Sequence, residues 1–276
     1  MKINAHTQLY CIFGNPVRHS LSPIIHNVAF QKLNINATYL AFEPPTLQQA
    51  WQAIKTLDIK GVSLTIPYKI KALSLADDLD DLAEKIGSLN TLHNIKGKIK
   101  GYNTDGWGAF LALQENKVKI KGRSVLIIGN GGSARAIAFT LLTEGAKIHL
   151  AGRNLRKVEG LTQDLIKINN QATPLLLKDL DEKYMQGIDI IINTTPLGMN
   201  PKPNISPLPK KILHNHHLVF DIVYAPEETL LLKDALARKA KIIKGKEMLI
   251  YQAIKQLEIW TGHTIEKDII LKALNK

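Results

Sequence analysis

The sequence predicts an α/β protein made of two units, the second of them a doubly wound parallel sheet. Two observations lead to this fold class. Short apolar runs alternate with segments of helical periodicity in two separate series along the chain. The second series opens with a glycine-rich turn between a strand and a helix. The length of 276 residues agrees, because domains of ~150 residues would give about 1.8 domains.

The first alternating series occupies the N-terminal part of the chain. Its expected strands are Leu9–Phe13, Thr38–Phe42, Gly61–Ile66, Thr91–Ile95 and Ile99–Tyr102. Its expected helices are one that begins at Ser22-Pro23, with Ser22 as N-cap and Pro23 as first helical residue, and two at Leu47–Leu57 and Ala72–Ile86. This alternation predicts a mostly parallel sheet with helices on its faces.

The second series follows a basic linker at Lys117–Arg123. Its expected strands are Ser124–Ile128, Lys147–Ala151, Ile188–Asn193 and Leu218–Val223, with Ile242-Ile243 as a further candidate. Its expected helices are Ala134–Glu144 and Val158–Ile168. Two helical segments, Met248–Ile259 and Ile265–Leu274, end the chain and are free to pack back on the first unit.

Composition excludes several classes of protein. Hydrophobic residues make up 45% and charged residues 22% of the chain, which is typical of globular proteins and not of disordered or fibrous ones. The single cysteine, Cys11, excludes a disulfide framework and a cysteine-based zinc site. The sequence contains no recognisable signal peptide and no apolar run of ~20 residues. We therefore expect a cytoplasmic protein with no membrane partner.

The charge is strongly positive but scattered. Thirty-six Lys and Arg against 24 Asp and Glu give a formal net charge of +12, which would attract anionic ligands. No basic tail or aromatic-interleaved stripe is present, so we expect no nucleic-acid partner. The cluster His214–His217 has no Asp, Glu or Cys beside it to complete a ligand set, and we expect no metal site. The sequence leaves monomer and homodimer open.

The segment Ser124-Val-Leu-Ile-Ile-Gly-Asn-Gly-Gly-Ser-Ala134 has the pattern of a phosphate-binding turn. Gly129, Gly131 and Gly132 would let the backbone approach a pyrophosphate at the positive end of the following helix. Any α/β fold can contain a tight glycine turn, but here the next strand follows at the distance that a dinucleotide site requires. The pattern therefore favours a dinucleotide cofactor.

The end of that next strand distinguishes the cofactor. An NAD site places an acidic residue there to accept hydrogen bonds from the ribose 2′-OH. This chain has Gly152 instead, followed by Arg153, Arg156 and Lys157. Cations oppose the dipole at a helix N-terminus, whereas a 2′-phosphate binds them through charge-assisted hydrogen bonds. The sequence thus predicts NADP.

The segment Gly14-Asn-Pro-Val-Arg-His-Ser-Leu-Ser-Pro-Ile-Ile-His-Asn27 joins the first strand to the first helix. Two hydroxyl groups, on Ser20 and Ser22, lie at the positive end of that helix and suggest a carboxylate site. At this point the sequence resembles the shikimate dehydrogenase family, whose N-terminal pattern is G-N-P-[IV]-x-H-S-x-S-P-x-x-H-N.

The resemblance extends along the chain. Gly61-Val-Ser-Leu-Thr-Ile-Pro-Tyr-Lys69 resembles the family pattern G-x-N-V-T-x-P-[FY]-K. Similar matches are Gly87-Ser-Leu-Asn-Thr91, Gly101-Tyr-Asn-Thr-Asp-Gly106, Asn193-Thr-Thr-Pro-Leu-Gly-Met199, Gly245-Lys-Glu-Met-Leu-Ile-Tyr-Gln252 and Trp260-Thr-Gly262. The resemblance implies a substrate-binding and catalytic α/β domain of residues 1–104 with 246–276, and an NADP-binding Rossmann domain of residues 105–245.

What the resemblance implies for activity is the reversible NADP-linked reduction of 3-dehydroshikimate to shikimate in chorismate and aromatic amino acid biosynthesis. Lys69 and Asp105 would be the catalytic pair. The implied substrate-binding residues, besides that pair, are Ser20, Ser22, Thr65, Asn90, Tyr224 and Gln252. The implied cofactor-binding residues are Asp81, Gly129, Asn130, Gly131, Gly132, Ser133, Arg153, Asn154, Lys157, Ile222 and Gly245. A lysine ammonium can donate the proton that an alkoxide needs after hydride delivery, and Asp105 can orient it.

Three departures from the family pattern stand out. Ser63 replaces the usual Asn and has a shorter reach. Asn154 stands in a segment that departs from the commoner N-R-T. Lys244 replaces an acidic residue, and nothing in the sequence explains it. The alternatives are a quinate or quinate/shikimate dehydrogenase, and a non-catalytic ligand-sensing relative; the presence of both Lys69 and Asp105 argues against the second.

Overall fold

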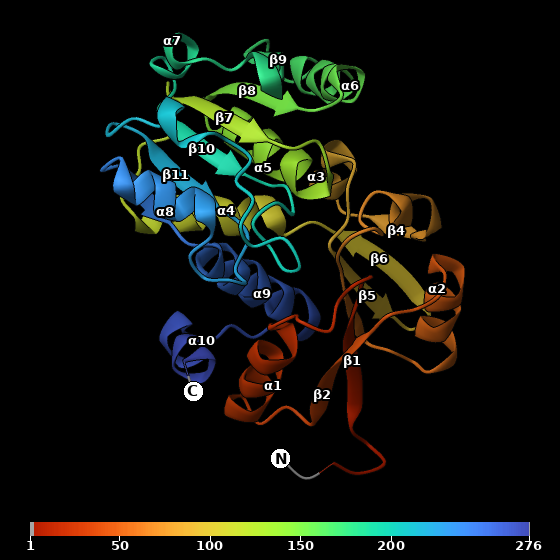
Figure 1. The fold of residues 1–276 in the computed structure, drawn as a ribbon. Helices are drawn as coiled ribbons and strands as arrows, with labels where there is room; N and C mark the ends of the chain where they lie inside the picture. The colour runs from red at the N-terminus through yellow and green to blue at the C-terminus, as the bar shows by residue number, and fades with distance from the viewer. Residues whose placement is uncertain (1–2, 276) are drawn as a thin grey trace. The chain divides into compact units, whose positions relative to one another are not determined.

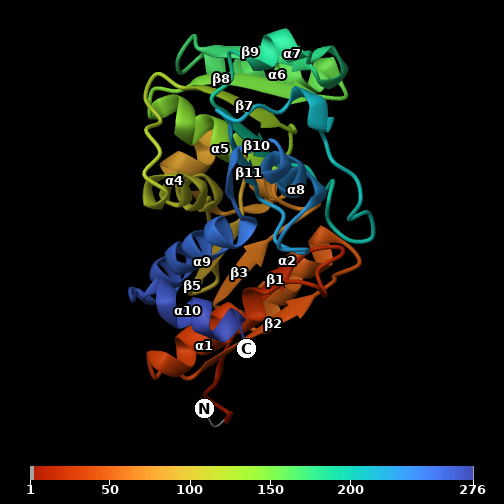
Figure 2. The same ribbon diagram turned by 60° about the vertical axis from the view of Figure 1, so that its left-hand side comes forward.

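The computed structural model describes residues 3–275, which divide into two compact units. Unit 1 contains the described residues up to Asp105 and from Ile250 onward, and unit 2 runs from Gly106 to Leu249. Each unit contains one six-stranded sheet (Figures 1 and 2). The predicted α/β class with a Rossmann-type second unit is confirmed.

Unit 1 has a mixed sheet in the order β2-β1-β3-β5-β6-β4. Its strands are β1 (Gln8–Phe13), β2 (Ala37–Phe42), β3 (Gly61–Leu64), β4 (Asp78–Leu79), β5 (Thr91–Ile95) and β6 (Lys98–Tyr102). Its helices are α1 (Ser22–Lys32), α2 (Leu47–Thr56), a 3₁₀ turn at Lys71–Leu75, α3 (Asp81–Ile86) and α10 (Lys267–Leu274). Strands β2, β1 and β3 are parallel, whereas β5 is antiparallel to both β3 and β6. Strand β4 is parallel to β6, so of these six strands all except β5 run in the same direction. The prediction of a mostly parallel sheet is therefore confirmed except at β5, which the tight turn before β6 makes antiparallel.

Side chains of β1 alternate between the two faces of this sheet. Cys11 and Phe13 join the core formed with Trp51 and Ile54 of α2. Tyr10 faces the other way and packs on Phe30 of α1 and on Trp260, with ring centroids 4.9 and 5.5 Å apart. Both faces are therefore covered, and the C-terminal helices complete one of them.

Two local predictions in unit 1 are wrong. The expected helix Ala72–Ile86 is instead a 3₁₀ turn, the short strand β4 and helix α3. Acidic side chains interrupt it: Asp77 accepts a hydrogen bond from the Ile99 amide at 2.8 Å, and Asp80 caps α3 by accepting from the Leu82 amide. Ser22 is not the N-cap of α1, because the helix begins one residue earlier and Leu21 holds the cap position. The Ser20 hydroxyl oxygen accepts from the Ser22 amide instead, at 3.2 Å.

Unit 2 has a fully parallel sheet in the order β12-β11-β10-β7-β8-β9. Its strands are β7 (Ser124–Ile128), β8 (Lys147–Gly152), β9 (Ala172–Leu176), β10 (Ile190–Asn193), β11 (Leu218–Asp221) and β12 (Lys241–Ile243). Its helices are α5 (Gly132–Thr143), α6 (Leu155–Ile166), α7 (Glu182–Met185) and α8 (Leu230–Ala237), with 3₁₀ turns at Leu177–Asp179 and Lys210–Ile212. The boundary between the two units is crossed twice, once within helix α4 (Asp105–Glu115) and once within helix α9 (Gly245–Thr261).

The chain leaves β7 toward β8 and β9 and later returns to place β10 on the other side of β7. Strand order therefore reverses between β7 and β10, which is the place where doubly wound sheets bind their ligands.

Sequence reasoning did not identify α4, α8 or β9. Among residues 3–275, no helix is both long and apolar enough to cross a membrane.

A packing constraint on Gly61 gives the first testable prediction. A Cβ at this position would lie 2.6 Å from the ring atoms of Trp260, and the Trp260 indole is held by its hydrogen bond to the Leu92 carbonyl, at 2.9 Å. We expect Gly61→Ala to destabilise the protein by about 1–3 kcal/mol, as overpacked cores do, seen as a lower urea midpoint. Gly160→Ala, where a Cβ meets nothing within 4 Å, is the control and should be no less stable than the parent. An unshifted midpoint for Gly61→Ala would contradict the packing argument.

Candidate active site

The substrate-site residues predicted in unit 1 gather at one edge of its sheet, and strand direction explains why. β1 and β3 are parallel neighbours, so the segments that follow them, with Ser20, Ser22, Thr65 and Lys69, leave the same edge. β5 runs antiparallel to β3, so Asn90, which precedes β5, starts at that edge. The Asn90 carbonyl accepts from the Leu64 amide at 2.8 Å, and the Asn90 amide donates to the Tyr102 carbonyl at 3.1 Å.

Lys69 and Asp105 form an ion pair at this edge. The Lys69 ammonium lies 2.5 Å from Asp105 Oδ2, and the two side chains are only 15% and 4% exposed. Asp105 is the first residue of α4, and its amide donates to the Asn103 side-chain oxygen at 3.0 Å. The backbone of Lys69 is fixed as well, since its carbonyl accepts from the Leu89 amide at 2.8 Å. Both groups are therefore held in place before any ligand binds.

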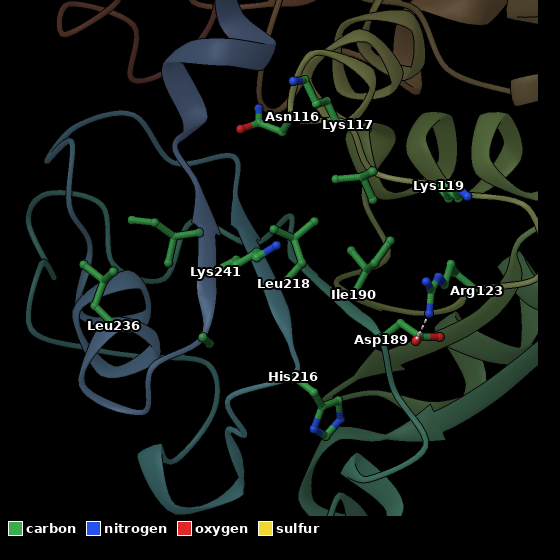
Figure 3. Close-up of a pocket in the computed structure, with 13 residues that line it drawn as sticks. Asn116, Lys117, Lys119, Arg123, Asp189, Ile190, His216, Leu218, Leu236 and Lys241 are labelled. Carbon is green, nitrogen blue, oxygen red and sulfur yellow. Dashed lines mark hydrogen bonds and ion pairs between the residues drawn. The ribbon is translucent and has the colours of Figure 1, made fainter.

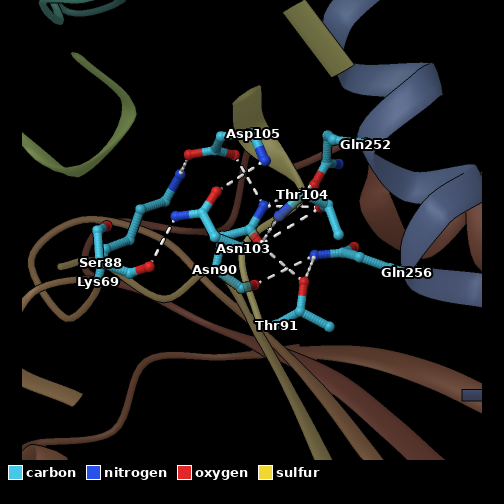
Figure 4. Close-up of polar contacts among 9 residues, drawn as sticks. All are labelled: Lys69, Ser88, Asn90, Thr91, Asn103, Thr104, Asp105, Gln252 and Gln256. Carbon is cyan, nitrogen blue, oxygen red and sulfur yellow. Dashed lines mark hydrogen bonds and ion pairs between the residues drawn. The ribbon is translucent and has the colours of Figure 1, made fainter. Parts of the chain in front are cut away.

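Asn90 connects this pair to Gln252 (Figure 4). Its side-chain nitrogen donates to Asp105 Oδ1 at 2.8 Å, to the Thr104 hydroxyl at 2.9 Å and to Gln252 Oε1 at 3.3 Å. Its side-chain oxygen accepts from the Thr104 amide at 2.8 Å and from the Thr91 hydroxyl at 2.7 Å. Asn90 is only 1% exposed. The structure thus brings together four of the predicted residues: Lys69, Asn90, Asp105 and Gln252.

The loops that carry the remaining predicted residues of this half also lie against one another. The Gly14 backbone abuts the Thr65 side chain so closely that a Cβ would collide with it, and the Asn15 amide donates to the Ile66 carbonyl at 2.9 Å. Ser22 is buried in the first turn of α1, and Ser20 and Thr65 are half-buried. Asp81, predicted to contact the cofactor, is the exposed first residue of α3.

In unit 2 the glycine turn follows β7 at the point where strand order reverses. Gly129 has a φ of +123°, a conformation that only glycine adopts readily, and a Cβ there would collide with Thr194 at the end of β10. A Cβ on Gly131, the N-cap of α5, would meet nothing within 4 Å. Open space at the start of a twelve-residue helix suits a pyrophosphate, so these residues fit the dinucleotide that the sequence predicts.

The basic residues after β8 are all exposed. Arg153, Arg156 and Lys157 surround the start of α6, where no acidic residue occupies the first turn. Asn154 is the N-cap of this helix, and its side-chain oxygen accepts from the Lys157 amide at 3.2 Å. Asn154 therefore has a structural role of its own, independent of any contact with a 2′-phosphate.

Sequence reasoning missed a buried carboxyl group at the end of β11. Asp221 is fully buried, and burial raises its pKa to about 6. It accepts from Asn193 at 2.9 Å, from the Val223 amide at 3.0 Å and from the Thr229 hydroxyl at 2.6 Å. These contacts fix the segment that carries Ile222 and Tyr224, both half-buried. An acidic residue inside the apolar run Leu218–Val223 was the available signal.

The structure explains Lys244, which the sequence did not. Its ammonium pairs with Glu227 at 3.2 Å and Glu228 at 2.9 Å, and Lys246 also pairs with Glu227. These carboxylates raise the pKa of Lys244. The pairs tie the turn before α9 to the loop that follows Tyr224. Gly245 is the first residue of α9, and a Cβ there would come within 2.5 Å of the Val223 carbonyl oxygen.

A separate pocket in unit 2 lies at the opposite edge of its sheet (Figure 3). It is lined where β10, β11 and β12 begin, by residues that include Ile190, Leu218 and Lys241. The glycine turn follows the carboxyl end of β7 and therefore lies at the other edge of this sheet. None of the predicted site residues lines this pocket.

Two buried histidines, His26 and His217, have partners within the protein. His26 is fully buried, stacks on Tyr39 with ring centroids 4.4 Å apart, and has a pKa lowered to about 3 by burial. His217 bonds the Met185 carbonyl at 2.9 Å. Within residues 3–275, no group of three or more His, Cys, Asp or Glu side chains is arranged to hold a metal ion.

Three family models match this chain. A shikimate dehydrogenase substrate-binding domain matches residues 12–92, a shikimate/quinate 5-dehydrogenase model residues 111–224, and a shikimate 5′-dehydrogenase C-terminal domain residues 245–274. A protein of Desulforamulus reducens named shikimate dehydrogenase (NADP(+)) is 39% identical over 100% of this chain and 97% of its own length.

Two solved structures extend the comparison. A crystal structure of a shikimate dehydrogenase in complex with NADP+ aligns with a TM-score of 0.91 at 38% identity, covering 99% of this chain and 96% of that one. Quinate dehydrogenase of Corynebacterium glutamicum in complex with NAD aligns with a TM-score of 0.88 at 25% identity, covering 98% and 99% of the two chains.

Proposed function

The chain belongs to the shikimate dehydrogenase family, and from that premise we propose that it catalyses the reversible NADP-linked reduction of 3-dehydroshikimate to shikimate. The observation that carries the proposal is the buried ion pair of Lys69 and Asp105, joined through Asn90 to Gln252 at one edge of a sheet. The relatives named above for NADP and the basic residues after β8 support the choice of cofactor.

Bound NADPH would supply hydride, and this chain's residues would manage the proton and the substrate. Reduction of a ketone leaves an alkoxide, and the Lys69 ammonium would donate a proton to it while stabilising its charge. Asp105, fixed by Asn90, would hold the Lys69 ammonium in position and accept a hydrogen bond from a substrate hydroxyl. In the reverse direction the Lys69 amine would take the proton back from the alcohol.

The two sheet edges support the following assignments of residues to cofactor and substrate. In unit 2, the turn of Gly129 to Ser133 would bind the pyrophosphate, Arg153 and Lys157 the 2′-phosphate, and Ile222 and Gly245 the nicotinamide end. In unit 1, Ser20, Ser22 and Thr65 would bind the substrate carboxylate and hydroxyls beside Asn90 and Gln252. Asp81 of unit 1 is a further proposed cofactor contact, and Tyr224 of unit 2 a further proposed substrate contact. Each of these roles is our proposal for the residue at that place.

Steady-state kinetics with shikimate and quinate, each with NADP and NAD, test the proposed function. We expect the highest kcat/KM with shikimate and NADP. A quinate/shikimate dehydrogenase is the second candidate, favoured by the structural likeness to the NAD-bound quinate dehydrogenase, and comparable kcat/KM values for quinate would establish it. A purely ligand-sensing role would show binding of shikimate without any change in NADPH absorbance.

The proposed carboxylate site makes its own prediction. Ser20→Ala and Ser22→Ala should each raise the KM for shikimate about 5- to 150-fold, because a ligand oxygen loses a hydrogen bond contributing ~1–3 kcal/mol. Ser74→Ala, which removes a hydroxyl exposed on the 3₁₀ turn of unit 1, serves as the control and should leave KM unchanged. Unchanged KM in both test variants would place the carboxylate elsewhere.

A further inference from the structure

A second group of buried polar side chains, formed by Tyr39, Ser63, Thr91 and Gln256, is hydrogen-bonded to Asn90; Figure 4 shows Thr91 and Gln256 beside it. The Tyr39 hydroxyl bonds Ser63 Oγ at 2.6 Å, and Ser63 Oγ bonds Gln256 Oε1 at 2.9 Å. Gln256 Nε2 bonds the Asn90 carbonyl at 3.1 Å and Thr91 Oγ1 at 3.0 Å. Thr91 in turn bonds Asn90 Oδ1. All five residues are less than 5% exposed.

The donor and the acceptor of each hydrogen bond in this buried network can be assigned. A backbone carbonyl only accepts, so the Gln256 group facing the Asn90 carbonyl must be its NH₂. Gln256 Oε1 then faces Ser63, so the Ser63 hydroxyl donates to it and accepts from Tyr39. Gln256 likewise donates to Thr91, whose own proton is left for Asn90 Oδ1.

This direction matters because it sets the orientation of the Asn90 amide. With Oδ1 accepting from Thr91 and from the Thr104 amide, Nδ2 must face Asp105 and Gln252. A reversed Asn90 would put oxygen against the Asp105 carboxylate. The Gln256 contacts therefore stabilise the one orientation that holds Asp105 against Lys69.

We propose that Gln256 is a positioning residue for the active site, and that Ser63 and Gln256 together fill the place of the asparagine usual at position 63 in the family pattern. The Ser63 side chain is shorter than that of an asparagine and carries no carboxamide. Gln256 of α9 supplies a carboxamide, which joins Ser63 to the Asn90 carbonyl and to Thr91. Gln256 is hydrogen-bonded to Ser63, Thr91 and the Asn90 carbonyl, so it acts on the ion pair through Asn90 and Thr91. The kinetic consequences of this inference rest on the proposed function, whereas its structural consequences do not.

The kinetic test replaces Gln256 by Met, which keeps the length of the side chain and removes its hydrogen bonds. We expect kcat/KM for shikimate to fall roughly 10- to 100-fold, because small displacements of catalytic groups have effects of this size. Leu257→Ala, a truncation at the neighbouring and equally buried position of the same helix, should lower the melting temperature and leave kcat/KM unchanged. Gln256→Ala should also lose activity, and Ser63→Asn/Gln256→Ala should recover at least ~10-fold of that loss.

A ligand-free measurement separates this inference from the proposed function. In the ¹⁵N-labelled full chain, we expect the Asn90 side-chain NH₂ protons to exchange slowly with solvent, and Gln256→Met to accelerate that exchange at least ~10-fold. If the unmodified enzyme does not oxidise shikimate, the proposed function fails and the exchange result alone decides the positioning role. An unchanged exchange rate in Gln256→Met overturns the inference. If the unmodified enzyme is active, an unchanged kcat/KM in Gln256→Met also overturns it. So does a folded Ser63→Asn/Gln256→Ala variant that recovers none of the activity lost in Gln256→Ala.

Discussion

Lys69→Ala and Asp105→Asn are each expected to lower kcat by about 10²–10⁴-fold, or ~3–5 kcal/mol of transition-state stabilisation. Lys69→Ala removes the proposed proton donor. Asp105→Asn removes the carboxylate that holds the Lys69 ammonium 2.5 Å away and that accepts from Asn90. The KM for shikimate should change less than kcat in Lys69→Ala. The measurement is NADPH absorbance under saturating substrate, with circular dichroism to confirm folding.

An exposed ion pair of the same chemistry provides the matched control. Lys100 of β6 lies 2.8 Å from Asp78 of the edge strand β4, and their side chains are 33% and 63% exposed, against 15% and 4% for Lys69 and Asp105. Lys100→Ala removes a lysine from such a pair and should leave kcat near that of the parent. A folded Lys69→Ala or Asp105→Asn variant with parental turnover would remove that residue from the proposed mechanism.

The wild-type enzyme is expected to prefer NADP over NAD by roughly 10²–10⁴-fold in kcat/KM. Only the 2′-phosphate distinguishes the two cofactors, and two charge-assisted contacts of ~1.5–3 kcal/mol each give a preference of this size. Arg153→Ala should lose a large part of it. Gly152→Asp with Arg153→Ile should shift preference toward NAD, because the carboxylate accepts from a 2′-OH and repels a phosphate. A Cβ at position 152 would lie 2.7 Å from Val158 Cγ2, so this variant should also carry Val158→Ala.

Ionic strength must be fixed in these measurements, because salt screens exposed charges. Lys167→Ala provides the control: it removes a positive charge at the other end of α6 and should leave cofactor preference unchanged. Equal efficiency with NAD and NADP in the wild type would favour the quinate-type alternative. An Arg153→Ala variant with its NADP preference intact would remove Arg153 from the proposed phosphate site.

The fold was predictable where local pattern and tertiary structure agree. The strands of the parallel sheet in unit 2 are short apolar runs bounded by turns, and the glycine turn after β7 lies where its pattern indicates. Strand β4 and helix α3 were not predictable, because Asp77 and Asp80 interrupt a helical periodicity through hydrogen bonds to distant or capping amides. The antiparallel pairing of β5 with β3 likewise depends on chain direction, which periodicity does not contain.

The candidate site divides in the same way. The sequence identified Lys69, Asn90, Asp105 and Gln252, and hydrogen bonds join them in the structure. It missed Gln256, although a residue four positions after Gln252 shares its helix face, because its partners Ser63 and Thr91 are 193 and 165 residues away along the chain. Long-range partners of this kind become visible only once the chain is folded.

The discontinuity of unit 1 has a consequence for the order in which the protein can be assembled during synthesis. Unit 2 is a single stretch, Gly106 to Leu249, and can fold as soon as that stretch has left the ribosome. Unit 1 begins before unit 2 but lacks Gln252, Gln256 and Trp260 until all of unit 2 has been synthesised. At ~5–20 residues per second, its open sheet face waits for seconds to tens of seconds, so the half of the chain that emerges first is the one that chaperones must protect longest.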